Sequence, residues 1–224
     1  MVMTPAQRHI IRRRAEAQAR GTDDARPVTG TAQEHMLAQL GEHKRSLHDI
    51  QSVERKIEFK RSILPDYEAY IDGVLAADTG EQDPVIATIM IWRFDVGDFA
   101  GGITLADYVL KHGVDMPDQY KRTPPTLIAE EMAEGFLKPQ VGVEPEPRPT
   151  LEQLLHIADK TDQADMHDQV RAKLEKAIGY ALRDAGQPEP ALARLERALQ
   201  LNARIGVKKD IEVLKREINK SAKD

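Results

Sequence analysis

Residues 92–113, "WRFDVGDFAGGITLADYVLKHG", decide the fold expected for this chain. The run holds a tryptophan, two phenylalanines, a tyrosine and four glycines, in a sequence with only 4% aromatic residues. Its glycines suggest a phosphate-binding loop, but such a loop follows a strand and carries a Lys-Ser/Thr pair. Here the preceding segment has a helical pattern, and "GGITL" supplies no lysine. The stretch therefore predicts a helix end, a "VGD" turn and a second helix, without a nucleotide site.

A second stretch, "AIGYALRDAGQPEPALARLERALQLN" at 177–202, has the spacing of a tetratricopeptide repeat. Aligning Gly97 with Gly186 places Gly102 on Ala191, so both stretches predict a pair of antiparallel helices. The match departs from the repeat at its large aromatic positions and at its closing proline, which Ala203 replaces. A repeat of this kind needs neighbours to bury its faces. The small residues that let the two helices approach are Gly179, Gly186, Ala191 and Ala198.

The composition fits an all-α protein whose core is mostly aliphatic. Hydrophobic residues make up 41% of the 224 residues, enough for one large or two small domains. The absence of cysteine excludes disulfides, thiolate metal sites and a cysteine nucleophile. No run of 18 apolar residues predicts a membrane span, and the polar, basic N-terminus does not resemble a secretory signal.

Prolines and glycines divide the chain into four parts. Residues 1–30 are predicted to be a flexible basic arm, and residues 31–137 an oligomerisation helix with a central helical domain. The segment 138–150, "KPQVGVEPEPRPT", holds four prolines and predicts a linker. Residues 151–224 are predicted to be a tetratricopeptide-like helical domain, beginning with a capping box between Thr150 and Gln153. Asp83 and Thr123 precede prolines and are predicted helix caps.

Residues 31–64 predict one long helix, because no proline interrupts them and apolar residues recur at heptad spacing. A seam of this length must bury against something. We favour self-association, and the alternative is an amphipathic helix that packs on its own domain. The seam consists of Met36, Leu40, Leu47, Ile50, Ile57 and Leu64, with polar residues at the remaining heptad positions.

Basic residues are concentrated at the two ends of the chain. Residues 1–64 hold 12 basic against 8 acidic residues and residues 170–224 hold 13 against 8, whereas residues 65–169 hold 7 against 21. Basic clusters bind polyanions by releasing condensed counterions. The predicted DNA contacts are Arg8, Arg12, Arg13 and Arg14 in a first cluster, Arg55, Lys56, Lys60 and Arg61 in a second, and Lys121 and Arg122 before a helix start. The alternative for the second and third sets is a solvated surface.

Three segments together resemble the small terminase subunit of P-two-type temperate tailed phages. They are "TPAQRHIIRR" (4–13), "WRFDVGDFAGGITLADYVLKHGVDMPDQYKRTPP" (92–125) and the C-terminal stretch from Val170 to Ile218. The resemblance covers almost the whole chain in the same order. It implies a ring-like homo-oligomer in the host cytoplasm that recognises packaging-site DNA. It also implies that the oligomer hands this DNA to the large ATPase subunit for cutting and genome packaging.

The family is sometimes labelled the terminase endonuclease subunit, but no nuclease motif is visible in this sequence. Glu58 and Lys60 point about 200° apart on a helix, and Asp95 and Asp98 match turn and capping chemistry. No catalytic residue, metal ligand or cofactor is therefore assigned, and Mg²⁺ would be needed only if the endonuclease label held. Two alternatives stay open beside DNA recognition: a helical-repeat protein–protein adaptor that never touches DNA, and a metal-dependent endonuclease subunit.

Overall fold

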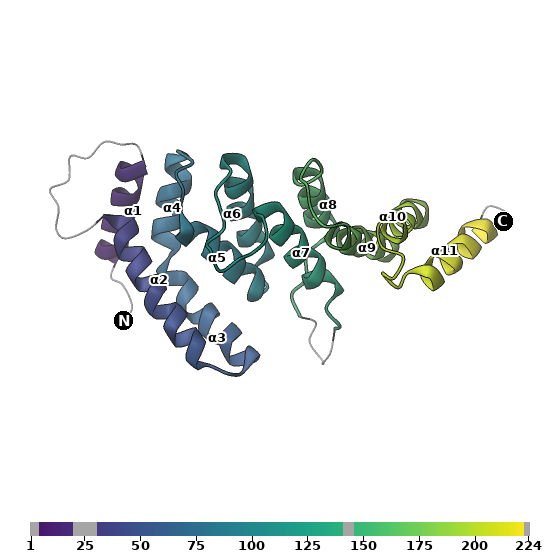
Figure 1. The fold of residues 1–224 in the computed structure, drawn as a ribbon, viewed down its shortest axis with the longest axis horizontal. Coiled ribbons are helices and arrows are strands. Elements are labelled where there is room, and N and C mark those ends of the chain that lie inside the picture. Colours follow the sequence, from purple (N-terminus) through teal and green to yellow (C-terminus); the bar gives the residue numbers. More distant parts are fainter. Residues whose placement is uncertain (1–4, 20–30, 141–145, 222–224) are drawn as a thin grey trace. The chain divides into compact units, whose positions relative to one another are not determined.

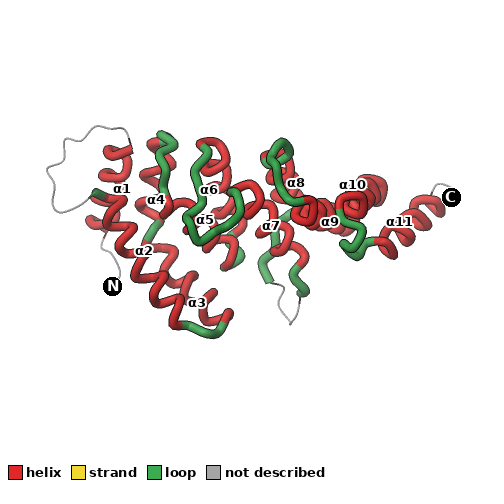
Figure 2. Tube along the Cα trace, viewed as in Figure 1, coloured by secondary structure: helices red, strands yellow, loops and turns green. Residues whose placement is uncertain are grey.

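A computed structural model describes residues 5–19, 31–140 and 146–221. These ranges are all α-helical: they hold eleven α-helices and one short 3-10 helix, and no strand occurs within them (Figure 2). The predicted all-α class is therefore confirmed. The chain divides into two compact units, Met1–Lys121 and Arg122–Asp224. We call them unit 1 and unit 2.

Unit 1 consists of six α-helices and the 3-10 turn (Figure 1). The turn sits between α3 and α4, where Pro65 ends the regular helix as predicted. The apolar α5 is buried on nearly all sides, and Ile86, Ile89 and Met90 have no exposed surface. The helices are α1 (Pro5–Ala19), α2 (Ala32–Asp49), α3 (Val53–Ile63), α4 (Glu68–Ala77), α5 (Pro84–Asp95) and α6 (Phe99–His112), with η1 at Leu64–Asp66.

The long helix predicted over residues 31–64 is wrong, because two helices stand there. A capping box between Thr31 and Glu34 begins α2, which ends at Asp49. Ile50 then adopts an extended conformation, and the Ser52 hydroxyl accepts a hydrogen bond from the Arg55 amide to begin α3. The serine offers the backbone a cap, which competes with continuation of the helix. The heptad pattern runs through this break and therefore did not reveal it.

The flexible arm predicted over residues 1–30 is wrong for residues 5–19, which form α1 and pack against α4. This packing rests on two small residues, Ala15 and Gly73. Ala15 is 3% exposed, and Gly73 lacks the side chain that would hold the helices apart. The rest of the predicted arm lies outside the described residues.

The opening stretch forms the predicted helix, turn and helix. Gly97 has φ 82°, the left-handed conformation that favours glycine, and it closes α5. The Asp98 amide donates to the Arg93 carbonyl at 2.9 Å, and the Gly97 amide donates to the Phe94 carbonyl at 3.0 Å. Gly102 lies against the Phe94 ring, where a β-carbon would come within 2.5 Å of it. The glycines therefore serve a turn and a helix crossing, as the sequence predicts.

Unit 2 consists of α7 (Pro124–Leu137), α8 (Leu151–Lys160), α9 (Asp168–Asp184), α10 (Pro188–Leu201) and α11 (Lys208–Ser221). The predicted capping box of Thr150 and Gln153 begins α8. The hairpin of α9 and α10 closes so tightly that a β-carbon on Gly179 would lie 2.6 Å from the Leu195 side chain. Leu154, Ile157, Leu174, Ile178 and Leu195 form the fully buried centre.

The division into units falls one helix before the predicted linker. Helix α7 packs on α8 and α9. After the loop, Arg148 returns to this helix and stacks on the Phe136 ring, 4.9 Å from its centroid. Lys138 and Glu146 also form an ion pair. Residues on the two sides of the proline-rich segment thus contact each other within unit 2, and its role as a linker stays a prediction.

Candidate nucleic-acid interface

The first basic cluster lies on α1, whose attachment to α4 determines which of its residues face solvent. Arg8, Arg12 and Arg13 are exposed, whereas Ala15 is buried against Gly73. Arg12 forms an i,i+4 ion pair with Glu16 at 3.1 Å, and its side chain remains 51% exposed. The side chain of the predicted Arg14 lies outside the described residues. The structure therefore presents three arginines outward from one helix.

The charge of α1 favours a polyanion. The helix carries four arginines and a single acidic residue, Glu16. Ile10 is also exposed, at 47%, beside these cations. Cations spaced along a helix neutralise successive phosphates and release counterions. Because α1 is held by a close helix crossing, its arginines are ordered before a ligand arrives, which lowers the entropic cost of binding.

The second predicted cluster is divided between internal and external roles. Lys60 forms an ion pair with Asp95 at 2.6 Å, and Arg61 donates to the Val96 carbonyl at 3.2 Å. Both interactions anchor α3 to the turn between α5 and α6. Arg55 is exposed and Lys56 is half-buried. Lys60 is thereby committed to an internal partner, a role that sequence spacing did not indicate.

The two basic clusters lie at opposite ends of α2 (Figure 1). The 18 residues of this helix span about 27 Å. At the far end, the exposed cation Arg55 is accompanied by exposed Glu54 and Glu58. The nearly balanced charge of α3 makes it a weaker partner for phosphate than α1.

The last predicted pair has different surroundings for its two members. Lys121 is exposed, and Arg122 forms an ion pair with Glu130 of α7. Arg122 therefore compensates a carboxylate of its own unit. Thr123 stands at the predicted cap position, but its hydroxyl bonds the Thr126 hydroxyl at 2.8 Å instead of a backbone amide.

Sequence reasoning missed one exposed cation of unit 1. Arg45 lies on the outer surface of α2 and forms no ion pair among the described residues. The signal was the local run "HKRSLH" at 43–48. Its neighbour Lys44 donates to Gln119 at 3.3 Å, so only Arg45 of that pair faces solvent without such a partner.

The seam predicted for oligomerisation is largely used inside unit 1. Met36, Leu40, Leu47 and Leu64 are at most 9% exposed in the single chain. Ile50 and Ile57 are only half-buried. The first four side chains thus contribute to the core of their own unit, as the amphipathic alternative expects. The self-association role of the seam stays a prediction.

The carboxylates that could serve a nuclease have structural partners. Asp98 caps α6 by accepting from the Gly101 amide at 2.9 Å, and it forms an ion pair with Arg93 at 2.5 Å. Arg93 also holds Glu68 at 2.7 Å. No cluster of three potential metal-ligating side chains occurs among the described residues. The capping interpretation of Asp98 is therefore confirmed.

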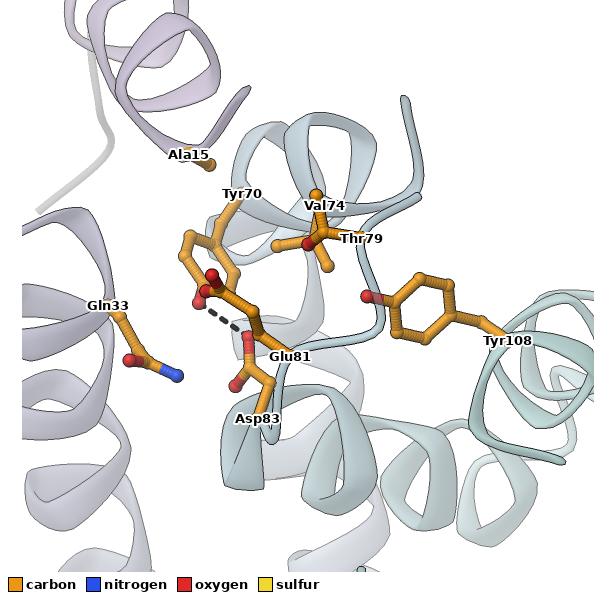
Figure 3. Close-up of a pocket in the computed structure, with 8 residues that line it drawn as sticks. All are labelled: Ala15, Gln33, Tyr70, Val74, Thr79, Glu81, Asp83 and Tyr108. Carbon is orange, nitrogen blue, oxygen red and sulfur yellow. Dashed lines mark hydrogen bonds between the residues drawn. The ribbon is translucent and has the colours of Figure 1, made fainter. Parts of the chain in front are cut away.

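A small pocket lies where α1, α2 and α4 meet the loop before α5 (Figure 3). The Tyr70 hydroxyl donates to the Asp83 carboxylate at 2.5 Å, and Asp83 accepts from the Val85 amide at 2.8 Å as the predicted cap of α5. Burial raises the pKa of Asp83, while these hydrogen bonds oppose the rise. Ala15 of α1 lines the same pocket. Its buried polar groups satisfy one another, so the pocket fixes the base of α1.

The fold and the basic first helix define an all-α protein with a surface suited to nucleic acid. No helix in the described part of the chain is both long and apolar enough to cross a membrane. The family described as "Phage small terminase subunit" matches residues 37–169.

Two curated relatives extend the match. The chain is 42% identical over 216 residues to the "Terminase, endonuclease subunit" of Escherichia phage P2, covering 96% of this chain and 85% of that protein. It is 25% identical over 185 residues to the "Probable terminase, endonuclease subunit" of Haemophilus phage HP1, covering 75% of this chain and 64% of that protein. No solved structure matches. The chain belongs to the phage small terminase subunit family and takes part in phage DNA packaging.

Proposed function

We propose that this chain assembles into a ring-like oligomer, recognises packaging-site DNA and presents it to the large ATPase subunit. The observation that supports DNA binding is the outward row of Arg8, Arg12 and Arg13 on a helix fixed to its unit by Ala15. A single helix with three such cations binds weakly. An oligomer repeats the helix, and effective concentration then multiplies the affinity.

DNA binding measured over a range of salt concentrations tests this function. Packaging-site DNA and a scrambled duplex should both bind the full chain, with the packaging site preferred. The double variant Arg8→Ala/Arg13→Ala should bind both more weakly. Its plot of log affinity against log salt should be shallower by about 0.9 for each phosphate that the variant no longer neutralises.

A matched control removes two exposed arginines of unit 2, Arg204 and Arg216. This double variant loses the same charge and should bind DNA like the wild type. Wild-type binding by the Arg8→Ala/Arg13→Ala variant would overturn the assignment of α1. An absence of DNA binding at moderate salt would instead favour the adaptor function, in which the helical hairpins bind only protein.

The word "endonuclease" in the names of both relatives raises cleavage as a second function. The ion pairs of Asp95 and Asp98 favour DNA binding over cleavage by this subunit, because these carboxylates already neutralise Lys60 and Arg93. Incubation of the isolated chain with DNA and Mg²⁺ should leave the duplex intact. Cleavage that disappears in Asp95→Asn would contradict this expectation.

A further inference from the structure

Val53 is the most exposed of the large hydrophobic residues that the structure describes, at 71%. It is the first residue of α3, directly after the break that divides the predicted long helix. Ile57 follows one turn later and is half-buried. Residues four apart lie on the same face of a helix, so these two side chains form one apolar strip. We call this strip the α3 flank.

The opposite side of α3 is occupied by interactions within unit 1. Phe59 lies edge-on to His43, with ring centroids 6.0 Å apart, and Ile63 is 7% exposed. Lys60 and Arg61 hold the end of the helix to the turn between α5 and α6. These interactions fix the orientation of α3 and leave the α3 flank facing solvent.

The charges beside the α3 flank are self-complementary. Glu54 and Arg61 are exposed and lie seven residues apart, on the same side of Ile57. If two α3 helices pack antiparallel about Ile57, Glu54 of one copy faces Arg61 of the other. The same pair forms again through the two-fold axis. Val53 then packs against the aliphatic stem of Lys60 in the second copy.

We propose that the α3 flank is a self-association surface, which binds the α3 flank of a second copy of this chain in antiparallel orientation. The proposal deepens the oligomer of the proposed function and rests on it. It assigns the interface to Val53, Ile57, Glu54 and Arg61, because the rest of the predicted seam is buried in its own unit. A two-fold interface joins copies in pairs, so the assembled particle holds an even number of chains.

Native mass spectrometry and sedimentation velocity of the full chain test the interface. Val53→Glu places a charge in the apolar centre twice per interface and should weaken self-association about a hundredfold. A carboxylate at the first turn of α3 favours the helix dipole, so the helix still forms, as circular dichroism will show. The matched control Val213→Glu alters an exposed valine of α11, 44% exposed, and should assemble like the wild type.

A charge exchange tests the orientation. Glu54→Arg and Arg61→Glu should each weaken association about fivefold, and the double variant should recover it. Residues seven apart on one helix lie too far from each other for direct pairing, so recovery requires the second copy.

The outcomes separate this proposal from the proposed function. Unchanged assembly of Val53→Glu, or particles with an odd number of chains, would overturn the α3 interface while leaving a DNA-binding oligomer intact. A wild-type chain that stays monomeric at all concentrations would overturn the oligomer itself, and the α3 interface with it.

Discussion

Ala15 of α1 lies directly over Gly73 of α4. A β-carbon built on Gly73 would stand 2.7 Å from the Ala15 β-carbon and 2.7 Å from the Arg12 carbonyl oxygen. One of these atoms belongs to the backbone and cannot swing away. The absence of a side chain at residue 73 therefore allows α1 to pack on α4, and it links the arginine surface to the core of unit 1.

We expect Gly73→Ala to destabilise unit 1. Alanine normally favours a helix over glycine by about 0.5–1 kcal/mol. At this crossing, however, the added methyl group forces the helices apart at a cost of about 1–3 kcal/mol. Urea unfolding and hydrogen exchange of α1 will measure the effect. DNA affinity should fall as well, because the arginines of α1 lose their fixed position.

Gly41 provides the matched control for this substitution. It lies inside α2, and a β-carbon there meets nothing within 4 Å. Gly41→Ala should therefore stabilise the protein by about 0.5–1 kcal/mol. Equal effects at the two positions would contradict the close crossing of α1 and α4.

Tyr70→Phe should destabilise the protein more at pH 8 than near pH 4. Burial raises the pKa of Asp83, so the stability that accompanies its protonation is present at low pH and disappears as pH rises through the raised pKa. The Tyr70 hydroxyl stabilises the charged form that exists above this range. Its removal should cost about 1–3 kcal/mol there, measured by urea unfolding at both pH values.

Tyr180→Phe serves as the control in unit 2. The Tyr180 hydroxyl donates to Asp210 at 3.0 Å, but this carboxylate is also held by Arg183 at 3.0 Å. The second partner remains after the substitution, so the destabilisation should be smaller. A pH-independent cost of Tyr70→Phe would show that Asp83 does not titrate in this window.

Gly97→Ala and Gly186→Ala should have similar costs, because the two residues occupy the same position in equivalent turns. Their φ angles are 82° and 71°. The Gln187 amide donates to the Leu182 carbonyl at 3.0 Å, which repeats the bond from Asp98 to Arg93. Alanine in this conformation costs about 1–2 kcal/mol, which urea unfolding will show. A large difference between the two variants would contradict the equivalence of the turns.

Lys60→Met should loosen α3 without unfolding unit 1. The variant breaks the ion pair with Asp95, whose two side chains are 16% and 31% exposed. We expect faster hydrogen exchange in α3 and a global destabilisation of about 1 kcal/mol or less. The neighbouring variant Lys56→Met removes a cation without an ion-pair partner among the described residues, and should leave exchange in α3 unchanged.

Local patterns in the sequence predicted several parts of the fold correctly. The "VGD" turn, the cap at Asp83, the capping box at Thr150 and the end of a helix before Pro65 all follow from residues within four positions of one another. Such features depend on short-range hydrogen bonds and on backbone preference, which the local sequence specifies.

The candidate site was predictable only as a set of cations. Arg8, Arg12 and Arg13 were predicted and are exposed, but their ordered presentation depends on Gly73, about sixty positions away. Lys60 was predicted to bind DNA and instead pairs with Asp95. No local signal distinguishes a cation that faces solvent from one that compensates a distant carboxylate.

By itself, the sequence determined the helical class, the turn at Gly97 and the family resemblance, because each rests on a local pattern or a long identifying stretch. Only the tertiary structure decided that residues 5–19 dock on α4, that the heptad seam breaks after Asp49, and that Val53 remains exposed. The physical reason is that burial and ion pairing depend on which distant segments meet. Periodicity specifies a face of a helix, but it does not specify what covers that face.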